Sequence, residues 1–283
     1  MAVKFLIDSA SDINREEAQK LGVTMLPMVI TFGMKEYMDG ENLLPTEFYE
    51  KLVESDELPK TSQISAYRFE EQFEKLTKDG DEVIAIVISS KLSGTFNMAK
   101  NASEKFGGKV FVLDSLSAAA GERLLLEVGL KLASEGKTGQ EIFDELNKKK
   151  EKLVVMAMVD MLEYLKKGGR VSSAVAFAGQ MLSIKPVVGI VDGEVKLLGK
   201  AMGSKKANNL LNQLVDKSGG IDFTLPVSVL WSGLSDVLMQ KYLKDSAPLY
   251  KENLAEVPAH ILGPTIGTHV GPGAVGVAFF GKN

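Results

Sequence analysis

The residues best suited to hold an anion lie between positions 89 and 95, in the order Ser-Ser-Lys-Leu-Ser-Gly-Thr. An apolar run from Val83 to Ile88 precedes them and a helical pattern follows, so we expect them at a strand-to-helix turn. Such a turn directs hydroxyl groups and the free N–H groups of the helix start toward one point. That point suits a carboxylate or a phosphate. A serine cap with a close-packing glycine explains the same residues about equally well.

Two further polar segments are candidates for a site. Residues 61–65, Thr-Ser-Gln-Ile-Ser, place three hydroxyl groups close together, although alone they are typical of an ordinary loop that enters a helix. Residues 168–172, Gly-Gly-Arg-Val-Ser, predict a helix end followed by a new helix start. An ordinary structural explanation is a C-cap glycine followed by an arginine that bonds exposed carbonyl groups, and we favour that explanation for the glycines.

The chain has only two histidines, His260 and His269. His269 lies in the glycine-rich segment 267–273, which predicts a loop where backbone can approach a ligand and where no helix buries the ring. His260 lies in an apolar strand-like run, which favours a structural role. His269 is therefore the better candidate for a site.

Several kinds of chemistry lack the residues that they need. The 283-residue chain has no cysteine, which excludes disulfides, thiol catalysis and cysteine-bound metals. It also lacks a Gly-x-Ser-x-Gly elbow, a Walker phosphate loop, zinc-protease histidine spacing and a dinucleotide fingerprint after the first strand. These absences argue against catalysis by the chain alone and predict no cofactor.

Charge and hydropathy narrow the range of partners. Lys and Arg number 33 against 37 Asp and Glu, a formal charge of −4 that does not favour nucleic acid. No apolar run reaches the roughly 18 residues that a transmembrane helix needs, and the first residues do not resemble a signal peptide. We expect a cytoplasmic protein.

Short apolar runs alternate with helical patterns, which predicts an α/β fold with a largely parallel sheet in the first part of the chain. The charged stretch 148–152 is a reasonable boundary, so we expect one α/β domain over 1–152 and a mixed α/β domain over 153–283. A 283-residue chain is long enough for two ordinary domains.

Local signals place individual elements. Asn14 and Glu17 have the spacing of a helix start, and Gly22 is suited to end that helix. We expect one strand over Val23–Phe32, and a β-hairpin with a type I′ turn at Asp192-Gly193. A helix is predicted to begin after Ser172 or Ser173.

Taken in order, these motifs resemble the DegV family of fatty-acid-binding proteins that serve bacterial fatty acid kinase. The likeness covers nearly the whole chain, from Asp8-Ser9 to the histidine-glycine segment at the end. It implies a two-domain fold with a long-chain fatty acid buried between the domains. By that likeness the head group would contact five residues: Thr61, Ser62, Ser93, Gly94 and His269.

The resemblance also implies partners. A separate ATP-dependent kinase would make the acyl phosphate for phospholipid synthesis, a membrane acyltransferase is a further expected partner, and Arg170 matches a residue near the pocket mouth that engages the kinase. A second arginine of that surface is missing here, where residues 202–204 are Met-Gly-Ser, and Ile64 replaces a proline usual in the first hydroxyl motif. The carrier itself would not be an enzyme.

The alternative from the residues is a serine acyl hydrolase or thioesterase, with Ser93 as the nucleophile and His269 as its base. This alternative predicts covalent labelling of Ser93 by a serine-directed reagent, whereas a carrier does not react.

Overall fold

The computed structural model describes residues 2–171 and 184–282. Four parallel strands form the first sheet, in the order β2(Thr24–Leu26), β1(Val3–Asp8), β6(Glu82–Val87) and β7(Val110–Asp114). The parallel sheet predicted for the first part of the chain is thus confirmed.

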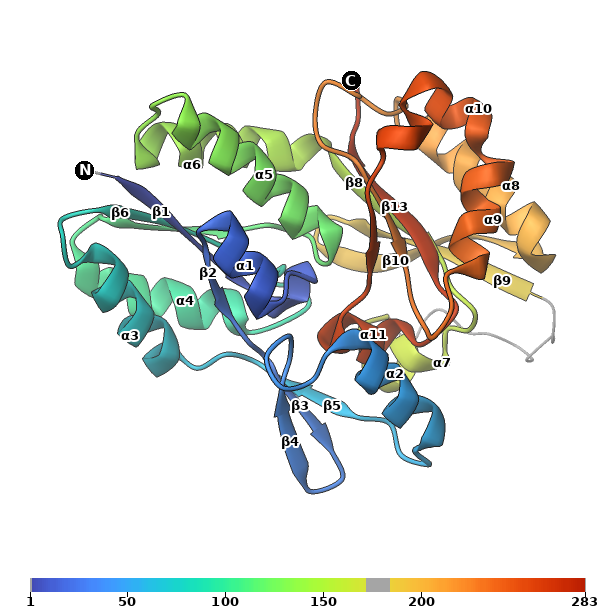
Figure 1. Cartoon of the computed structure of the whole chain (residues 1–283), viewed down its shortest axis with the longest axis horizontal. Helices are drawn as coiled ribbons and strands as arrows, with labels where there is room; N and C mark the ends of the chain where they lie inside the picture. The colour runs from blue at the N-terminus through green and yellow to red at the C-terminus, as the bar shows by residue number, and fades with distance from the viewer. Residues whose placement is uncertain (1, 172–183, 283) are drawn as a thin grey trace.

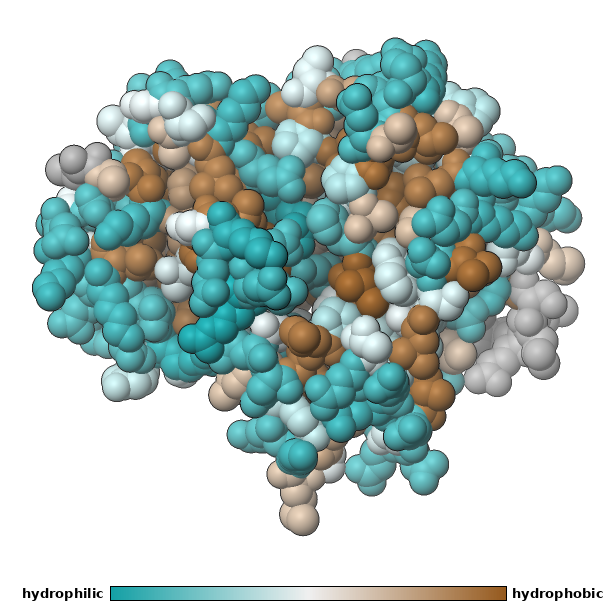
Figure 2. Space-filling model, in the orientation of Figure 1, coloured by the Kyte–Doolittle hydropathy of each residue, from teal (hydrophilic) through white to brown (hydrophobic). Residues whose placement is uncertain are grey.

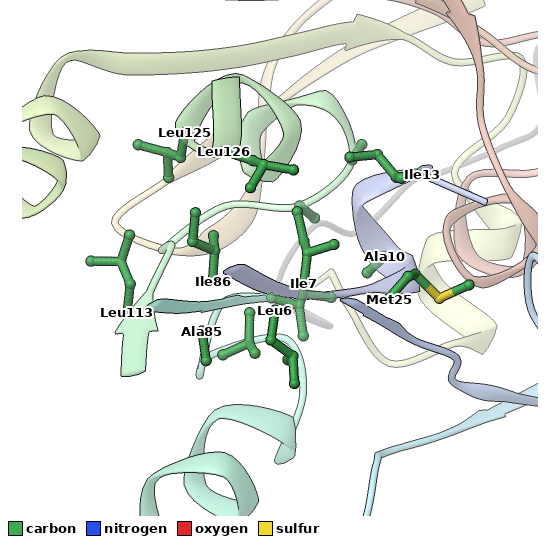
Figure 3. Close-up of a cluster of buried hydrophobic side chains, with 14 of the residues drawn as sticks. Leu6, Ile7, Ala10, Ile13, Met25, Ala85, Ile86, Leu113, Leu125 and Leu126 are labelled. Carbon is green, nitrogen blue, oxygen red and sulfur yellow. The ribbon is translucent and has the colours of Figure 1, made fainter. Parts of the chain in front are cut away.

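Helices cover both faces of this sheet (Figure 1), with α3(Ala66–Thr77) and α4(Thr95–Ser103) on one side and α5(Ala120–Ser134) and α6(Gly139–Lys149) on the other. Its strands are therefore continuous apolar runs, because both faces are buried. In Figure 3, Ile7 and Ile86 point toward α5 while Leu6 and Ala85 point toward the opposite helix layer.

The first helix, α1(Arg15–Leu21), forms as its end signals predict. The Asn14 side chain accepts a hydrogen bond from the N–H of Glu17 at 2.9 Å, and Gly22 ends the helix with a φ of 69°. The prediction of a single strand over Val23–Phe32 is wrong. This segment forms two strands in different sheets, since the chain leaves the parallel sheet after β2 and begins β3(Val29–Phe32) beyond Pro27.

The β3 strand belongs to a small antiparallel sheet in the order β4(Lys35–Met38), β3, β5(Lys60–Ser62). This sheet projects from the lower edge of the molecule in Figure 1, beside α2(Pro45–Glu54). On the face shown in Figure 2, hydrophilic residues dominate and hydrophobic ones show through in separate patches.

The second large sheet has six strands in the order β10(Glu194–Met202), β9(Ile184–Val191), β8(Leu153–Met158), β13(Val275–Phe280), β11(Ser228–Trp231) and β12(Ala259–Ile261). Only β11 and β12 pair in parallel, so the sheet is mixed. Helices α8(Gly203–Lys217) and α9(Val237–Asp245) pack against it, and α10(Ala247–Tyr250) follows α9.

Helix α5 and a hydrogen bond after the end of β6 are among the contacts that hold the large sheets against each other. Helix α5 packs on β1 and β6 of the first sheet and on β8, β11 and β13 of the second. The predicted hairpin turn forms between β9 and β10 with positive φ at both Asp192 and Gly193, and the Ser89 hydroxyl donates to the Gly193 carbonyl at 2.8 Å. The end of β6 is thereby fastened to the second sheet. The helix predicted after Ser172 or Ser173 lies outside the described residues.

A row of four paired residues, with two small ones at its centre, crosses the middle of the second sheet. Val188, Ala157, Gly276 and Leu230 are paired in turn across the adjacent strands β9, β8, β13 and β11. A Cβ atom at position 276 would lie 2.6 Å from the Met156 carbonyl oxygen and 2.8 Å from the Ala157 Cβ atom. Glycine at this position therefore allows β13 to pair closely with β8.

Substitution of Gly276 by alanine tests this constraint. We expect Gly276→Ala to lower the free energy of unfolding by about 2 kcal/mol or more, because both neighbours belong to the paired strand rather than to a flexible side-chain end. Urea denaturation followed by circular dichroism measures the change. Gly107→Ala is the control, since nothing lies within 4 Å of its added methyl group and only backbone strain opposes it. Equal losses in the two variants would contradict the packing argument.

Candidate functional site

A cavity of about 280 Å³ lies between the carboxyl end of the first sheet and the inner face of the second. Crevices at the carboxyl ends of parallel strands are common ligand sites. All six residues singled out from the sequence line this cavity: Thr61, Ser62, Ser93, Gly94, Arg170 and His269.

Most of the cavity wall is apolar. The row of paired residues described above forms part of it, together with Val155 and Val159 from the β8 region and Ile88 after β6. Ala157 and Gly276 occupy the middle of that row, so the wall recedes where larger side chains would fill the space. The wall suits a hydrocarbon chain, because it offers few polar partners along its length.

The polar end of the cavity is built around Thr61 and His269. Thr61 lies on β5, and its Oγ1 atom is hydrogen bonded to the His269 Nε2 atom at 3.0 Å. These residues are 208 positions apart in the chain. The structure thus brings the first hydroxyl motif and the histidine segment into one cluster.

The prediction that His269 lies in a loop is wrong, because the residue lies in the last turn of a short helix, α11(Pro264–Val270). Its start is held by two carboxylates, since Asp12 accepts from the Gly263 N–H at 2.7 Å and Asp39 from the Thr265 N–H at 3.1 Å. Gly267 then lets α11 approach α2, where an added Cβ atom would lie 2.5 Å from the ring of Phe48. Here glycine serves close helix packing rather than loop formation.

Burial lowers the pKa of His269 from 6.5 to about 4, and the nearby positive charge of Arg170 acts in the same direction. The imidazole is therefore neutral near pH 7. Its Nδ1 atom is buried and has no hydrogen-bond partner among the residues that the structure describes.

Ser93 belongs to a second polar cluster at the start of α4. Its hydroxyl is hydrogen bonded to the Thr95 hydroxyl at 2.9 Å, and the Thr95 N–H donates to Ser93 Oγ at 3.3 Å. Thr95 Oγ1 also accepts from the Ile64 N–H at 3.4 Å, which links the two hydroxyl motifs. A side chain at Gly94 would overlap the amide oxygen at the movable end of the Gln63 side chain, so glycine leaves room for the position that Gln63 takes here.

Arg170 bonds two backbone carbonyl groups beside the cavity. Its Nε–H donates to the Leu92 carbonyl at 3.2 Å and an Nη1–H donates to the Gly168 carbonyl at 2.5 Å. Burial lowers the pKa of Arg170, whose guanidinium still lines the cavity. The group is thus fixed in place beside the polar end.

The geometry does not assemble a serine nucleophile. His269 Nε2 bonds Thr61, whereas Ser93 bonds Thr95. A general base in a catalytic triad needs a group that orients its second nitrogen, and Nδ1 has no such partner in the described part of the chain. These contacts weaken the hydrolase alternative.

Sequence reasoning missed two polar residues of the cavity, Gln63 and Thr265. Gln63 stands inside the first hydroxyl motif, so its position was the available signal. Thr265 follows Pro264 at the start of α11, and no local pattern predicts that this helix reaches the cavity.

Over residues 2–171 and 184–282, no cluster of three or more His, Cys, Asp or Glu side chains is arranged to hold a metal ion. Over the same residues, no helix is both long enough and apolar enough to cross a membrane.

The fold and the cavity define a class of α/β protein with a largely apolar site between two sheets, lined in part by hydroxyl groups, a histidine and an arginine. The model of the DegV family, described as an uncharacterised protein family, matches residues 2–282. The chain belongs to the DegV family.

The relatives match this chain over nearly their full length. A DegV domain-containing protein of Caldanaerobacter subterraneus is 33% identical over 98% of each chain. A solved structure described as fatty acid binding of a DegV family protein from Thermus thermophilus is 30% identical, with a TM-score of 0.88 over 99% of this chain and 100% of that one. A stearic acid-binding protein from Eubacterium ventriosum is 25% identical, with a TM-score of 0.84 over 100% and 99%. DegV structures thus share this mixed α/β fold, and DegV proteins bind fatty acids.

The buried neutral state of His269 predicts a pH-dependent contribution to stability. Between pH 6.5 and about 4 the unfolded state binds a proton at this residue and the folded state does not, so acid favours unfolding. The free energy of unfolding of the wild type minus that of His269→Gln should fall over this range as the pH falls, by up to about 3 kcal/mol. Urea titrations of both proteins at several pH values measure the difference.

Carboxylates that titrate in the same range contribute to both proteins and cancel in the difference. A difference that stays constant from pH 7 to pH 4 would show that His269 is not buried as a neutral base.

Proposed function

We propose that this protein is a carrier that holds a long-chain fatty acid with its tail in the cavity and its carboxylate at the polar end. One observation carries the proposal: a cavity of about 280 Å³ has a mostly apolar lining, to which Thr61, Ser93 and His269 add polar groups. The fatty-acid-binding relatives of the same fold support it.

The tail supplies the affinity in this proposal. Burying ~15 methylene groups at ~0.8 kcal/mol each gives roughly 12 kcal/mol of gross driving force, before the costs of association and ordering. The small residues Ala157 and Gly276 leave room for the tail beside the central strands.

The head group sets the orientation. A carboxylate taken out of water requires hydrogen-bond donors. The hydroxyls of Thr61, Ser62 and Ser93 and the backbone at Gly94 offer such donors. His269 is neutral, so it acts by orienting the Thr61 hydroxyl to which it is bonded.

The finer part of the proposal concerns partners. The carrier presents the carboxylate to a separate ATP-dependent fatty acid kinase in the cytoplasm, and Arg170 lies at the mouth where kinase and carboxylate meet. The resulting acyl phosphate is the substrate of a membrane acyltransferase. In this scheme residues 1–152 and 153–283 act as two domains that enclose the tail, which agrees with the assignment of their strands to different sheets.

The head-group assignment predicts weaker ligand binding in two variants. Ser93→Ala and Thr61→Val should each lower fatty acid affinity by about tenfold or more, because a hydrogen bond to a charged group is worth about 1.5–3 kcal/mol. Competition against a fluorescent fatty acid after delipidation measures the affinity. Ser134→Ala is the matched control, because its hydroxyl bonds its own exposed helix and does not line the cavity.

Affinities within threefold of the wild type in both cavity variants would overturn the head-group assignment. Native mass spectrometry of the purified wild type tests the carrier function itself, since it should reveal a fatty acid at near-unit stoichiometry that denaturation releases. If the purified protein carries no fatty acid and added fatty acid does not bind either, the proposed carrier function is wrong.

The kinase step has its own test. With a fatty acid kinase and ATP, the loaded protein should yield an acyl phosphate, which hydroxylamine traps as a hydroxamate. Arg170→Gln should reduce this yield while the protein stays loaded. Covalent labelling of Ser93 by a fluorophosphonate in the absence of kinase would instead favour the hydrolase.

A further inference from the structure

We propose that Gly168 is a positioning residue for His269. Its missing side chain lets the backbone close on the Nδ1 edge of the imidazole and holds the ring in the tautomer that carries its proton on Nε2. The consequence for ligand binding rests on the proposed function, whereas the tautomer is a property of the protein alone.

The backbone does not explain why residue 168 is glycine. Gly168 follows α7(Glu163–Lys167) with φ −71° and ψ −10°, an ordinary right-handed conformation that any residue adopts. Gly169 differs, because its φ is 70°. Gly168 is the C-cap residue of α7, but only Gly169, one position further on, needs glycine for its left-handed conformation. The glycine at position 168 therefore needs another explanation.

That explanation is the histidine ring. A Cβ atom at position 168 would overlap His269 Nδ1, and it would lie 3.0 Å from Cε1 and 3.1 Å from the Tyr164 carbonyl oxygen. No other ring atom comes closer than 3.1 Å, so the added atom would lie beyond Nδ1 at the edge of the ring rather than over its face. The Gly168 Cα–H group therefore points at the in-plane position of Nδ1.

This contact distinguishes the two neutral tautomers. A proton on Nδ1 would meet the Cα–H group and would be a buried donor without an acceptor. A lone pair on Nδ1 instead accepts the weakly polar Cα–H group. The proton then lies on Nε2, where it is donated to Thr61 Oγ1 at 3.0 Å.

The tautomer of His269 sets the direction of the Thr61 hydroxyl proton. Because its oxygen accepts from His269, its own hydroxyl proton is free to point into the cavity and to donate to a carboxylate. The opposite tautomer would accept from Thr61 and leave only a lone pair toward the ligand, which repels a carboxylate. Gly168 thereby acts on the head group through His269 and Thr61.

Arg170 supports the same state. The Gly168 carbonyl accepts from its guanidinium at 2.5 Å, so one glycine contacts the cation on one side and Nδ1 on the other. The positive charge beside the ring also opposes a second proton, in agreement with the lowered pKa of His269.

Nitrogen-15 NMR of the delipidated protein tests the tautomer. Long-range proton–nitrogen correlations identify which ring nitrogen carries the proton, and His260→Gln assigns the signals, since the chain has only two histidines. The wild type should show the proton on Nε2 of His269. A proton on Nδ1 would overturn the proposal, and this readout needs no variant at position 168.

Adjacent glycines provide a matched pair of variants. Gly168→Ala should displace the ring, change the His269 nitrogen signals and weaken fatty acid binding by about tenfold. Gly169→Ala strains a positive-φ position but meets no atom within 4 Å, so it should leave the His269 signals and the affinity within threefold of the wild type. Unchanged His269 signals in folded Gly168→Ala would overturn the positioning role.

Failure of this inference is distinguishable from failure of the proposed function. If the wild type binds fatty acid but carries its proton on Nδ1, only the tautomer is wrong. If the proton lies on Nε2 and no fatty acid binds, the result supports the positioning of His269 and contradicts the proposed carrier function.

Discussion

Buried carboxylates that accept backbone hydrogen bonds are the interaction on which the rest of this structure depends. Asp8 accepts from the N–H groups of Ala10 and Ile88, both at 2.8 Å, and so joins the ends of β1 and β6. Asp12 and Asp39 do the same for the start of α11. Burial is the main cause that raises their pKa values, to about 7 for Asp8 and about 6 for Asp39. The protein thus tolerates costly buried acids in order to hold distant segments together.

The cavity follows from those fastenings. Ile88 begins the segment that carries Ser93, and α11 carries His269, so the carboxylates locate both polar clusters relative to the parallel sheet. The second sheet is then held by α5 and by the Ser89–Gly193 hydrogen bond. Apolar space remains between the sheets because small residues occupy the middle of the facing wall. A polar end and an apolar body thereby arise from one set of contacts.

Sequence signals predicted correctly the features that depend only on residues close together in the chain. Asn14 and Gly22 end their helix as expected, because caps involve only neighbouring residues. The split of Val23–Phe32 and the helix around His269 were not predicted, since both depend on partners far along the chain. The six candidate residues do converge on one cavity, although residue spacing alone could not distinguish an anion site from ordinary caps. Order along the chain, rather than any single motif, carried the correct family.

The volume left between the sheets has a consequence for the life of the protein in a cell. An apolar cavity without an occupant forfeits packing energy on the order of several kcal/mol, which a well-fitting occupant restores by mass action. On these grounds an empty form would open more often and be cut more readily by proteases. Supply of the occupant would then govern how long each copy survives, so the abundance of the protein would follow the availability of what it carries.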